Sequence, residues 1–159
     1  MQWLEVLADQ SLQNLPYKIE LNENGHIEMS PASFLHSRLQ GKIAATLLMQ
    51  LGGDVFTELA IQTSKGVRVP DVAWGSEAYT LQHQNELWAS SAPEICIEII
   101  SPSNHSRAML EKIALFLEAG ATEVWLIEDQ GEITHYDHSG LIAMSRYPVD
   151  VSACFLKRS

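Results

Sequence analysis

The N-terminal third of the chain switches from a two-residue hydrophobic period to a longer one. Apolar and polar residues alternate over 17–21 and again over 26–29, after a turn rich in Asn and Gly, which predicts a hairpin. Residues 1–16 before it predict a short helix and a loop. Leu or Ile then recurs every fourth residue from Leu35 to Leu51, as in an amphipathic helix. We expect this helix to begin at Ser30-Pro31, since Ser is a favourable N-cap and Pro a favourable first residue.

The rest of the chain predicts further strands around a second helix. The expected elements are strands at 54–62, 67–74, 95–100 and 123–127, a helix from about His105 to Ala119, and a hairpin at 132–136 and 141–146. Pro70 cannot donate to a sheet ladder, so it marks an irregular point in its strand. The order predicts one α/β domain over 1–159, with its core at 17–146 and a mixed β-sheet flanked by helices.

The composition allows a sizeable core, but the net negative charge of the chain disfavours binding to a polyanion. Hydrophobic residues make up 46% of the chain, and 20 acidic against 10 basic residues give a formal charge of −10. Non-specific affinity for nucleic acid comes from Lys and Arg. An acidic chain must therefore concentrate its few cations, or bind metal ions, to hold DNA. The alternative is that the negative surface only keeps the protein in solution.

The cysteines and the N-terminus predict a cytoplasmic protein. Cys96 lies in an apolar run, and neither it nor Cys154 has the spacing of a disulfide framework or a zinc site. This favours a reducing compartment. The first residues lack the basic and apolar regions of a signal peptide, and no apolar run approaches the roughly 20 residues of a membrane helix. We expect no membrane association.

Two carboxylates lie in apolar settings where an ionised side chain is costly. Glu98 interrupts the apolar run 95–100, and Asp71 follows Pro70 with apolar residues on both sides. Buried carboxylates must be paired, protonated or bound to a metal. Two of them at adjacent strand ends can share Mg²⁺, which prefers oxygen ligands. The structural alternative is that Glu98 pairs with Lys or Arg across the sheet and that Asp71 caps a turn.

Lys112 is the candidate cation for this acidic pair. It lies on or beside the apolar stripe of Met109, Ile113 and Phe116. Its helix follows the strand that carries Glu98, and a right-handed crossover would lay that helix back across the sheet. The ammonium would then reach the space near Glu98. The alternative is a lysine with its stem packed and its charge in water.

Five segments share an order and spacing with a known group of enzymes. They are 25–31 followed by His36, 67–73 with Pro70-Asp71, 93–103 with Glu98, the pair Glu111-Lys112, and 120–127. Over about residues 17–137 the chain resembles the PD-(D/E)XK nuclease superfamily, and more closely its Uma-type restriction endonucleases. The resemblance implies a restriction-endonuclease-like fold with an N-terminal hairpin.

The resemblance also implies a role for each matching residue. Asp71 and Glu98 would bind Mg²⁺ or Mn²⁺ together with the backbone carbonyl of Ile99. Lys112 would be the catalytic lysine. The superfamily usually carries this lysine two residues after the second acid, and here Ile100 fills that position.

Three further residues match supporting positions of the group. Glu28 and His36 match an acid and a histidine near the site, where His36 would orient water or phosphate, or simply pack. Arg68 matches a basic residue that contacts phosphate or a carboxylate. The chain has Ala108 and Phe116 where the group often has Asp and Tyr, and these losses weaken the support expected for Lys112.

These residues predict a Mg²⁺- or Mn²⁺-dependent endonuclease that hydrolyses DNA phosphodiester bonds. The acidic charge and the missing Asp favour an alternative, a binding or regulatory module that keeps the nuclease fold without catalysis. A third reading is a structural subunit of a larger system. In each case we expect a homodimer.

Overall fold

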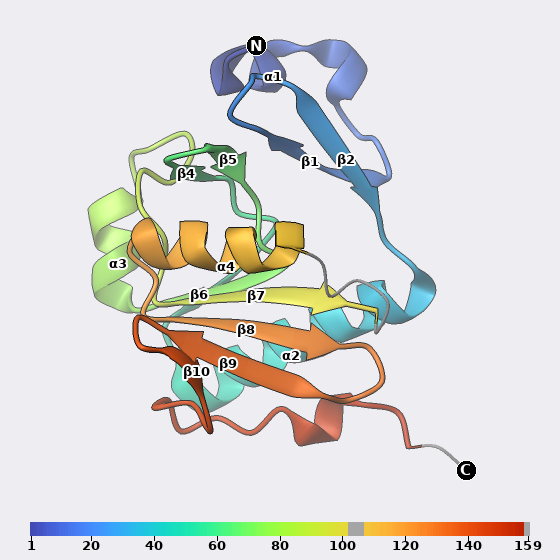
Figure 1. Ribbon diagram of the computed structural model, residues 1–159, viewed down its shortest axis with the longest axis vertical. Helices are drawn as coiled ribbons and strands as arrows, with labels where there is room; N and C mark the ends of the chain where they lie inside the picture. Colours follow the sequence, from blue (N-terminus) through green and yellow to red (C-terminus); the bar gives the residue numbers. More distant parts are fainter. Residues whose placement is uncertain (102–106, 158–159) are drawn as a thin grey trace.

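The strands form two sheets that lie one above the other in Figure 1. The computed structural model describes residues 1–101 and 107–157, and all statements below concern these residues. The larger sheet has the order β10 (Gly140–Ile142), β9 (Ile133–Asp137), β8 (Glu123–Glu128), β7 (Ile95–Ile100), β6 (Val72–Gly75) and β3 (Asp54–Thr57). The smaller sheet has the order β2 (Ile27–Pro31), β1 (Tyr17–Leu21), β5 (Gly66–Arg68) and β4 (Ile61–Thr63).

The helices α2 (Phe34–Leu51) and α4 (Arg107–Glu118) cover opposite faces of the larger sheet, and successive side chains of β7 pack alternately toward one and the other. The other helices are α1 (Trp3–Ala8) and α3 (Glu77–His83), with short 3₁₀ turns η1 (Gln10–Leu12) and η3 (Ser152–Cys154). Ile95, Ile97 and Ile99 pack in the core that includes α2, whereas Cys96 and Ile100 pack with α4. Because successive side chains of a strand point to opposite faces, Glu98 lies on the α4 side.

A bent hairpin joins the two sheets. Strands β3 and β4 belong to different sheets, and so do β5 and β6, although β3 pairs with β6 and β4 with β5. The bends lie side by side, at Glu58 with a φ of 58° and at Pro70-Asp71, and the Glu58 N–H donates to the Asp71 carbonyl at 3.4 Å. Asp71 therefore lies where the chain passes from one sheet to the other.

The structure confirms the mixed α/β class and corrects three element boundaries. The strands expected at 54–62 and 67–74 are wrong as single strands, since each is divided by one of these bends. The helix expected from Ser30-Pro31 begins at Phe34, because Tyr17 still pairs with Pro31 and the Ser33 side chain caps the helix by accepting from the His36 N–H. The predicted start of α4 at His105 lies outside the described residues.

The cores and the helices bear on two other expectations. Cys96 is buried as expected, and both cysteines are free. In residues 1–101 and 107–157, no helix combines the length and the apolar character needed to cross a membrane.

Candidate metal and phosphate site

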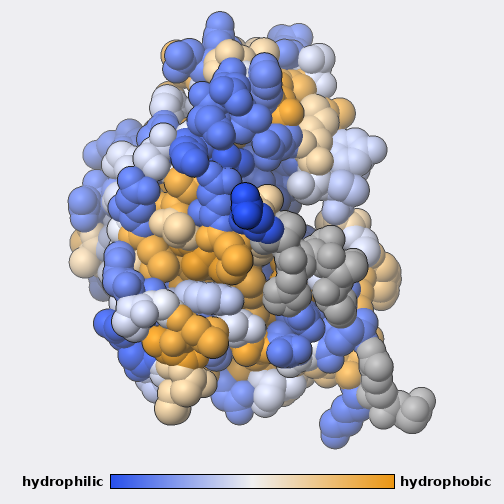
Figure 2. All heavy atoms as spheres, in the orientation of Figure 1, coloured by the Kyte–Doolittle hydropathy of each residue, from blue (hydrophilic) through white to orange (hydrophobic). Residues whose placement is uncertain are grey.

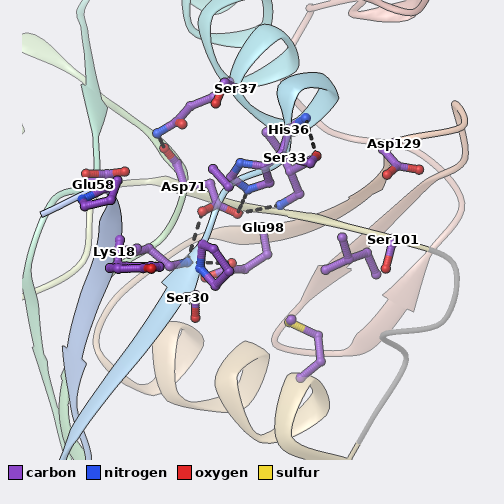
Figure 3. A pocket seen from close by; sticks show the side chains of 18 of the residues that line it. Lys18, Ser30, Ser33, His36, Ser37, Glu58, Asp71, Glu98, Ser101 and Asp129 are labelled. Carbon is purple, nitrogen blue, oxygen red and sulfur yellow. Dashed lines mark hydrogen bonds and ion pairs between the residues drawn. The ribbon is translucent and has the colours of Figure 1, made fainter.

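Strand register brings Asp71 and Glu98 together. Val72 at the start of β6 pairs with Ile97 of the antiparallel strand β7, so the residue before Val72 meets the residue after Ile97. Both carboxylates are buried, with 2% and 3% of their surface exposed. Figure 3 shows their side chains pointing toward one another and toward Lys18. The acidic pair inferred from the sequence is therefore present as a spatial pair.

Asp71 is held as a carboxylate by three donors. Its Oδ2 accepts from the Ile99 N–H at 2.8 Å and lies 3.1 Å from His36 Nε2, while Oδ1 accepts from Lys18 Nζ at 3.0 Å. Burial alone would raise the pKa of Asp71, but the hydrogen bond from His36 and the charge of Lys18 outweigh burial and lower it. Asp71 is accordingly ionised at neutral pH.

Glu98 lies between two ammonium groups. Lys112 Nζ is 2.8 Å from Oε1, and Lys18 Nζ donates to Oε2 at 3.2 Å. The contact with Lys112 is an ion pair whose angles do not suit a hydrogen bond, so Oε1 is a buried oxygen without a hydrogen-bond partner among the described residues. Burial raises the pKa of Glu98 to about 7, although Lys112 and Lys18 oppose the rise.

Lys112 reaches the acidic pair from α4, as the crossover predicts. Its ammonium contacts both Glu98 and Glu20 at 2.8 Å, and its side chain is only 13% exposed. The reading in which its charge lies in water is therefore wrong. The structural alternative is right that lysines pair with Glu98, but it is wrong that they lie across the sheet, because Lys18 comes from the smaller sheet and Lys112 from α4.

Lys18 and Glu20 belong to the site, and the sequence did not reveal them. Ile19 and Leu21 of β1 pack with α1 and β5, so Lys18 and Glu20 lie on the other face, toward the larger sheet. Glu20 also accepts from the Val69 N–H at 2.7 Å, which ties β1 to the bent hairpin. Burial lowers the pKa of Lys18, but the carboxylates of Glu98, Asp71 and Glu20 outweigh burial and raise it, so Lys18 is charged.

His36 extends from the first turn of α2 into the same cluster. Its Nε2 faces Asp71, while its Nδ1 is buried without a hydrogen-bond partner among the described residues. The hydrogen bond to Asp71 raises the pKa of His36, against the effect of burial. His36 therefore does more than pack, since it contacts Asp71, and its role in orienting water or phosphate stays a prediction.

A cavity of about 620 Å³ opens beside these residues. Its lining includes Lys18, His36, Asp71, Glu98 and Lys112, together with hydroxyls of Ser30, Ser33 and Ser37. The cavity therefore combines buried carboxylates with ammonium groups and hydroxyl donors. Such a lining suits a cation and an oxyanion bound side by side.

Glu28 and Arg68 are placed away from this cavity. Arg68 donates to Glu28 and to Glu23, each at 3.3 Å, and neither Glu28 nor Arg68 lines the cavity. The structure thus brings together Asp71, Glu98, Lys112 and His36 of the residues singled out, and Ile99 beside them, but leaves these two outside.

The donor set fits a divalent cation with few protein ligands. No group of three or more His, Cys, Asp or Glu side chains within 1–101 and 107–157 has the arrangement of a metal centre. Mg²⁺, however, is commonly held by one or two carboxylates with waters completing its shell. Asp71 and Glu98 supply two such carboxylates, and Oε1 of Glu98 is a buried oxygen whose hydrogen-bonding capacity is unused although it forms an ion pair with Lys112. Asp71, Glu98 and the Ile99 carbonyl are the residues that could hold the ion.

Comparison with known proteins identifies relatives over most of the chain. The family model described as "Uma2: Putative restriction endonuclease" matches residues 5–147, which include every residue of the cluster. A solved structure with a similar fold is that of a putative nuclease belonging to DUF820 from Anabaena variabilis ATCC 29413, with a TM-score of 0.62 and 23% sequence identity. The match covers 75% of this chain and 71% of that one. No curated protein matches the chain.

Proposed function

The chain belongs to the Uma2 family, which is described as "Putative restriction endonuclease", and from that premise we propose that it hydrolyses DNA phosphodiester bonds with the help of Mg²⁺ or Mn²⁺. The observation that carries the proposal is a buried cluster of two lysines and two acids. Lys18 lies within 3.2 Å of both Asp71 and Glu98, and Lys112 lies 2.8 Å from Glu98. Two ionisable pairs at the wall of a cavity are an expensive arrangement for stability alone. Perturbed carboxylates in a cavity are typical of functional sites.

Asp71 and Glu98 would hold the ion together with the Ile99 carbonyl. The bound ion would supply a water of lowered pKa and would neutralise charge on the phosphate. The Ile99 N–H and His36 fix the orientation of Asp71 through its Oδ2. These contacts fix the Asp71 side chain before any ligand arrives, so Asp71 itself needs little reorganisation when the ligand binds.

Lys112 would act on the phosphate and on the attacking water. Its ammonium is anchored by Glu20 on one side and Glu98 on the other, which fixes a mobile side chain at the cavity wall. A positive charge held at this position stabilises the negative charge that develops on the phosphoryl oxygens. It would also polarise a water that lies beside it in the cavity. Glu20 is a positioning residue in this scheme, because it acts through Lys112.

Cleavage of a supercoiled plasmid and of short duplexes with Mg²⁺ or Mn²⁺ tests the proposal. Asp71→Asn and Lys112→Met should each lower the cleavage rate by about 10²–10³-fold, with circular dichroism spectra like that of the wild type. Glu77→Gln is the matched control, because Glu77 is an exposed acid on α3 outside the cavity. A wild-type protein that cuts no DNA with either ion would contradict the proposal.

The alternative is a binding or regulatory module that keeps the fold without catalysis. The position of Lys18 favours it, because an ammonium between Asp71 and Glu98 already neutralises the pair. Titration of the metal-free protein with Mn²⁺ in a calorimeter separates the two. A catalytic site should bind Mn²⁺ and lose binding in Glu98→Gln, whereas a module built on Lys18 should bind no ion in either form.

We also propose that the protein works as a homodimer. One cluster per chain can attack one strand of a duplex at a time, so two copies would allow both strands to be cut. Phe34 at the start of α2 is 87% exposed and Met49 near its end is 84% exposed, and both offer apolar surface for such a contact. Light scattering after size-exclusion chromatography should give about twice the chain mass of 17.7 kDa. A mass of one chain at all loading concentrations would contradict the proposal.

A further inference from the structure

Lys18 lies between the two carboxylates that the ion would bind. Its Nζ is 3.0 Å from Asp71 Oδ1 and 3.2 Å from Glu98 Oε2, and its side chain is 9% exposed. The dashed lines in Figure 3 join these three side chains. Lys18 comes from β1 of the smaller sheet, whereas the two acids belong to the larger sheet and to the bend that joins the sheets. A cation from one sheet thus neutralises an acidic pair in the other.

We propose that Lys18 is a built-in competitor of the divalent cation, occupying the space between Asp71 and Glu98 and leaving it when the ion binds. The inference rests on the proposed function, because it assumes that these carboxylates bind the ion. Two carboxylates buried next to each other repel strongly unless a cation lies between them. The metal-free protein therefore needs Lys18 in place, and the ion must displace it.

The surroundings of Lys18 allow the ammonium to leave. Lys18 lines the cavity of about 620 Å³, so its side chain borders open space. Lysine has a flexible four-carbon stem and three rotatable donors, in contrast to the rigid fork of arginine. Removing the ammonium from its two partners has a free-energy cost, which subtracts from the affinity for the ion.

Lys112 differs from Lys18 in how it is held. It contacts the other oxygen of Glu98 and is anchored by Glu20, which is itself bound to the Val69 N–H. Among the described residues, its ion pairs are with Glu20 and Glu98 and not with Asp71. A cation entering between Asp71 and Glu98 would therefore take the position of Lys18 while Lys112 keeps Glu20 as its partner.

Mn²⁺ titration of the full chain by calorimetry tests the inference through binding alone. Lys18→Met and Lys18→Gln both remove the competing charge, and each should bind Mn²⁺ at least about tenfold more tightly than the wild type. Lys18→Arg keeps a cation between the acids and should not gain affinity. Lys65→Met is the matched control: it removes the same charge from an exposed pair with Glu111, and its affinity should stay within about twofold of the wild type.

Each other outcome contradicts a definite part of the scheme. Equal Mn²⁺ affinity in the wild type and both neutral variants would overturn the inference and leave the metal site intact. Binding by the neutral variants but not by the wild type would also overturn it, because the ion would then be unable to displace Lys18. Absence of binding in all forms would overturn the proposed metal dependence itself.

A second measurement covers the case in which a neutral variant is poorly folded. Without the ion, Lys18→Gln leaves Asp71 and Glu98 facing each other, so its melting temperature should lie below that of the wild type. Saturating Mn²⁺ should then raise the melting temperature of Lys18→Gln by more than that of the wild type, because a ligand that binds only the folded state stabilises it. An equal rise in both proteins would overturn the inference.

Discussion

At the residue scale, two acids in contact with the same ammonium have opposite shifts in pKa. Asp71 receives three donors, and its pKa is lowered. Glu98 has an oxygen without a hydrogen bond, and burial raises its pKa to about 7. The number of hydrogen-bond donors therefore separates two carboxylates of nearly equal burial. Asp71 is the permanent anion of the pair, and Glu98 is the member whose charge depends on pH and on a bound cation.

The metal-free protein should lose stability as the pH rises through the range in which Glu98 ionises. The pKa of Glu98 is raised from 4.5 to about 7, so its contribution is complete below pH 4.5 and is lost as the pH approaches 7. The free energy of unfolding should fall by up to about 1.4 kcal/mol per pH unit within this range. Urea denaturation in a chelator, at several pH values, measures this slope.

Glu98→Gln isolates the contribution, because glutamine cannot ionise. The difference in unfolding free energy between the two proteins should change between pH 5 and pH 6.5, because only the wild type can ionise at this position. Stability profiles that run parallel over that range would contradict the prediction.

At the element scale, the alternation of polar and apolar residues in each strand could be recognised from the sequence. What the polar face of a strand packs against could not be recognised. The hairpin, the helix after it, the buried strand β7 and the crossover to α4 all follow from hydrophobic periodicity. The same alternation in β1 gives no indication that Lys18 and Glu20 face a second sheet instead of water. The bends at Glu58 and Pro70-Asp71 were also missed, because Pro70 signals a break in a strand without showing that the chain changes sheets there.

The cap of α2 should contribute both to stability and to the placement of His36. Ser33 Oγ accepts from the His36 N–H at 3.1 Å, so the capped turn is the one that extends toward Asp71. Ser33→Ala should lower the free energy of unfolding by about 1 kcal/mol. Ser37→Ala is the control, because it places a good helix former in the next turn without removing the cap. Equal losses in urea denaturation would contradict a capping role for Ser33.

At the scale of the whole molecule, the chain carries a formal charge of −10, whereas the cavity is lined by the cations Lys18 and Lys112. Figure 2 shows hydrophilic side chains over the N-terminal hairpin and apolar ones over α4 and over the end of the larger sheet near β10. Exposed leucines such as Leu110 and Leu141 belong to these apolar areas. In this acidic chain, Lys18 and Lys112 line the cavity, where their charges can attract a phosphate.

DNA binding by this protein should accordingly depend weakly on monovalent salt. Each phosphate neutralised by Lys or Arg contributes about −0.9 to the slope of log affinity against log salt concentration. With Lys18 and Lys112 as the cations of the cavity, we expect a slope of about −2. Fluorescence anisotropy of a labelled duplex bound to Asp71→Asn measures it without cleavage. A slope much steeper than this would show a basic surface elsewhere.

The pairing of Val72 with Ile97 has a consequence for finding distant relatives of this protein. The two acids meet because of the ladder register between β6 and β7. The segment that connects these two strands, which includes α3, takes no part in the contact. Insertions and deletions over 76–94 would leave the meeting point unchanged. A search that aligns the two strands against each other should therefore recover homologues that a search for a fixed interval between Asp and Glu would miss.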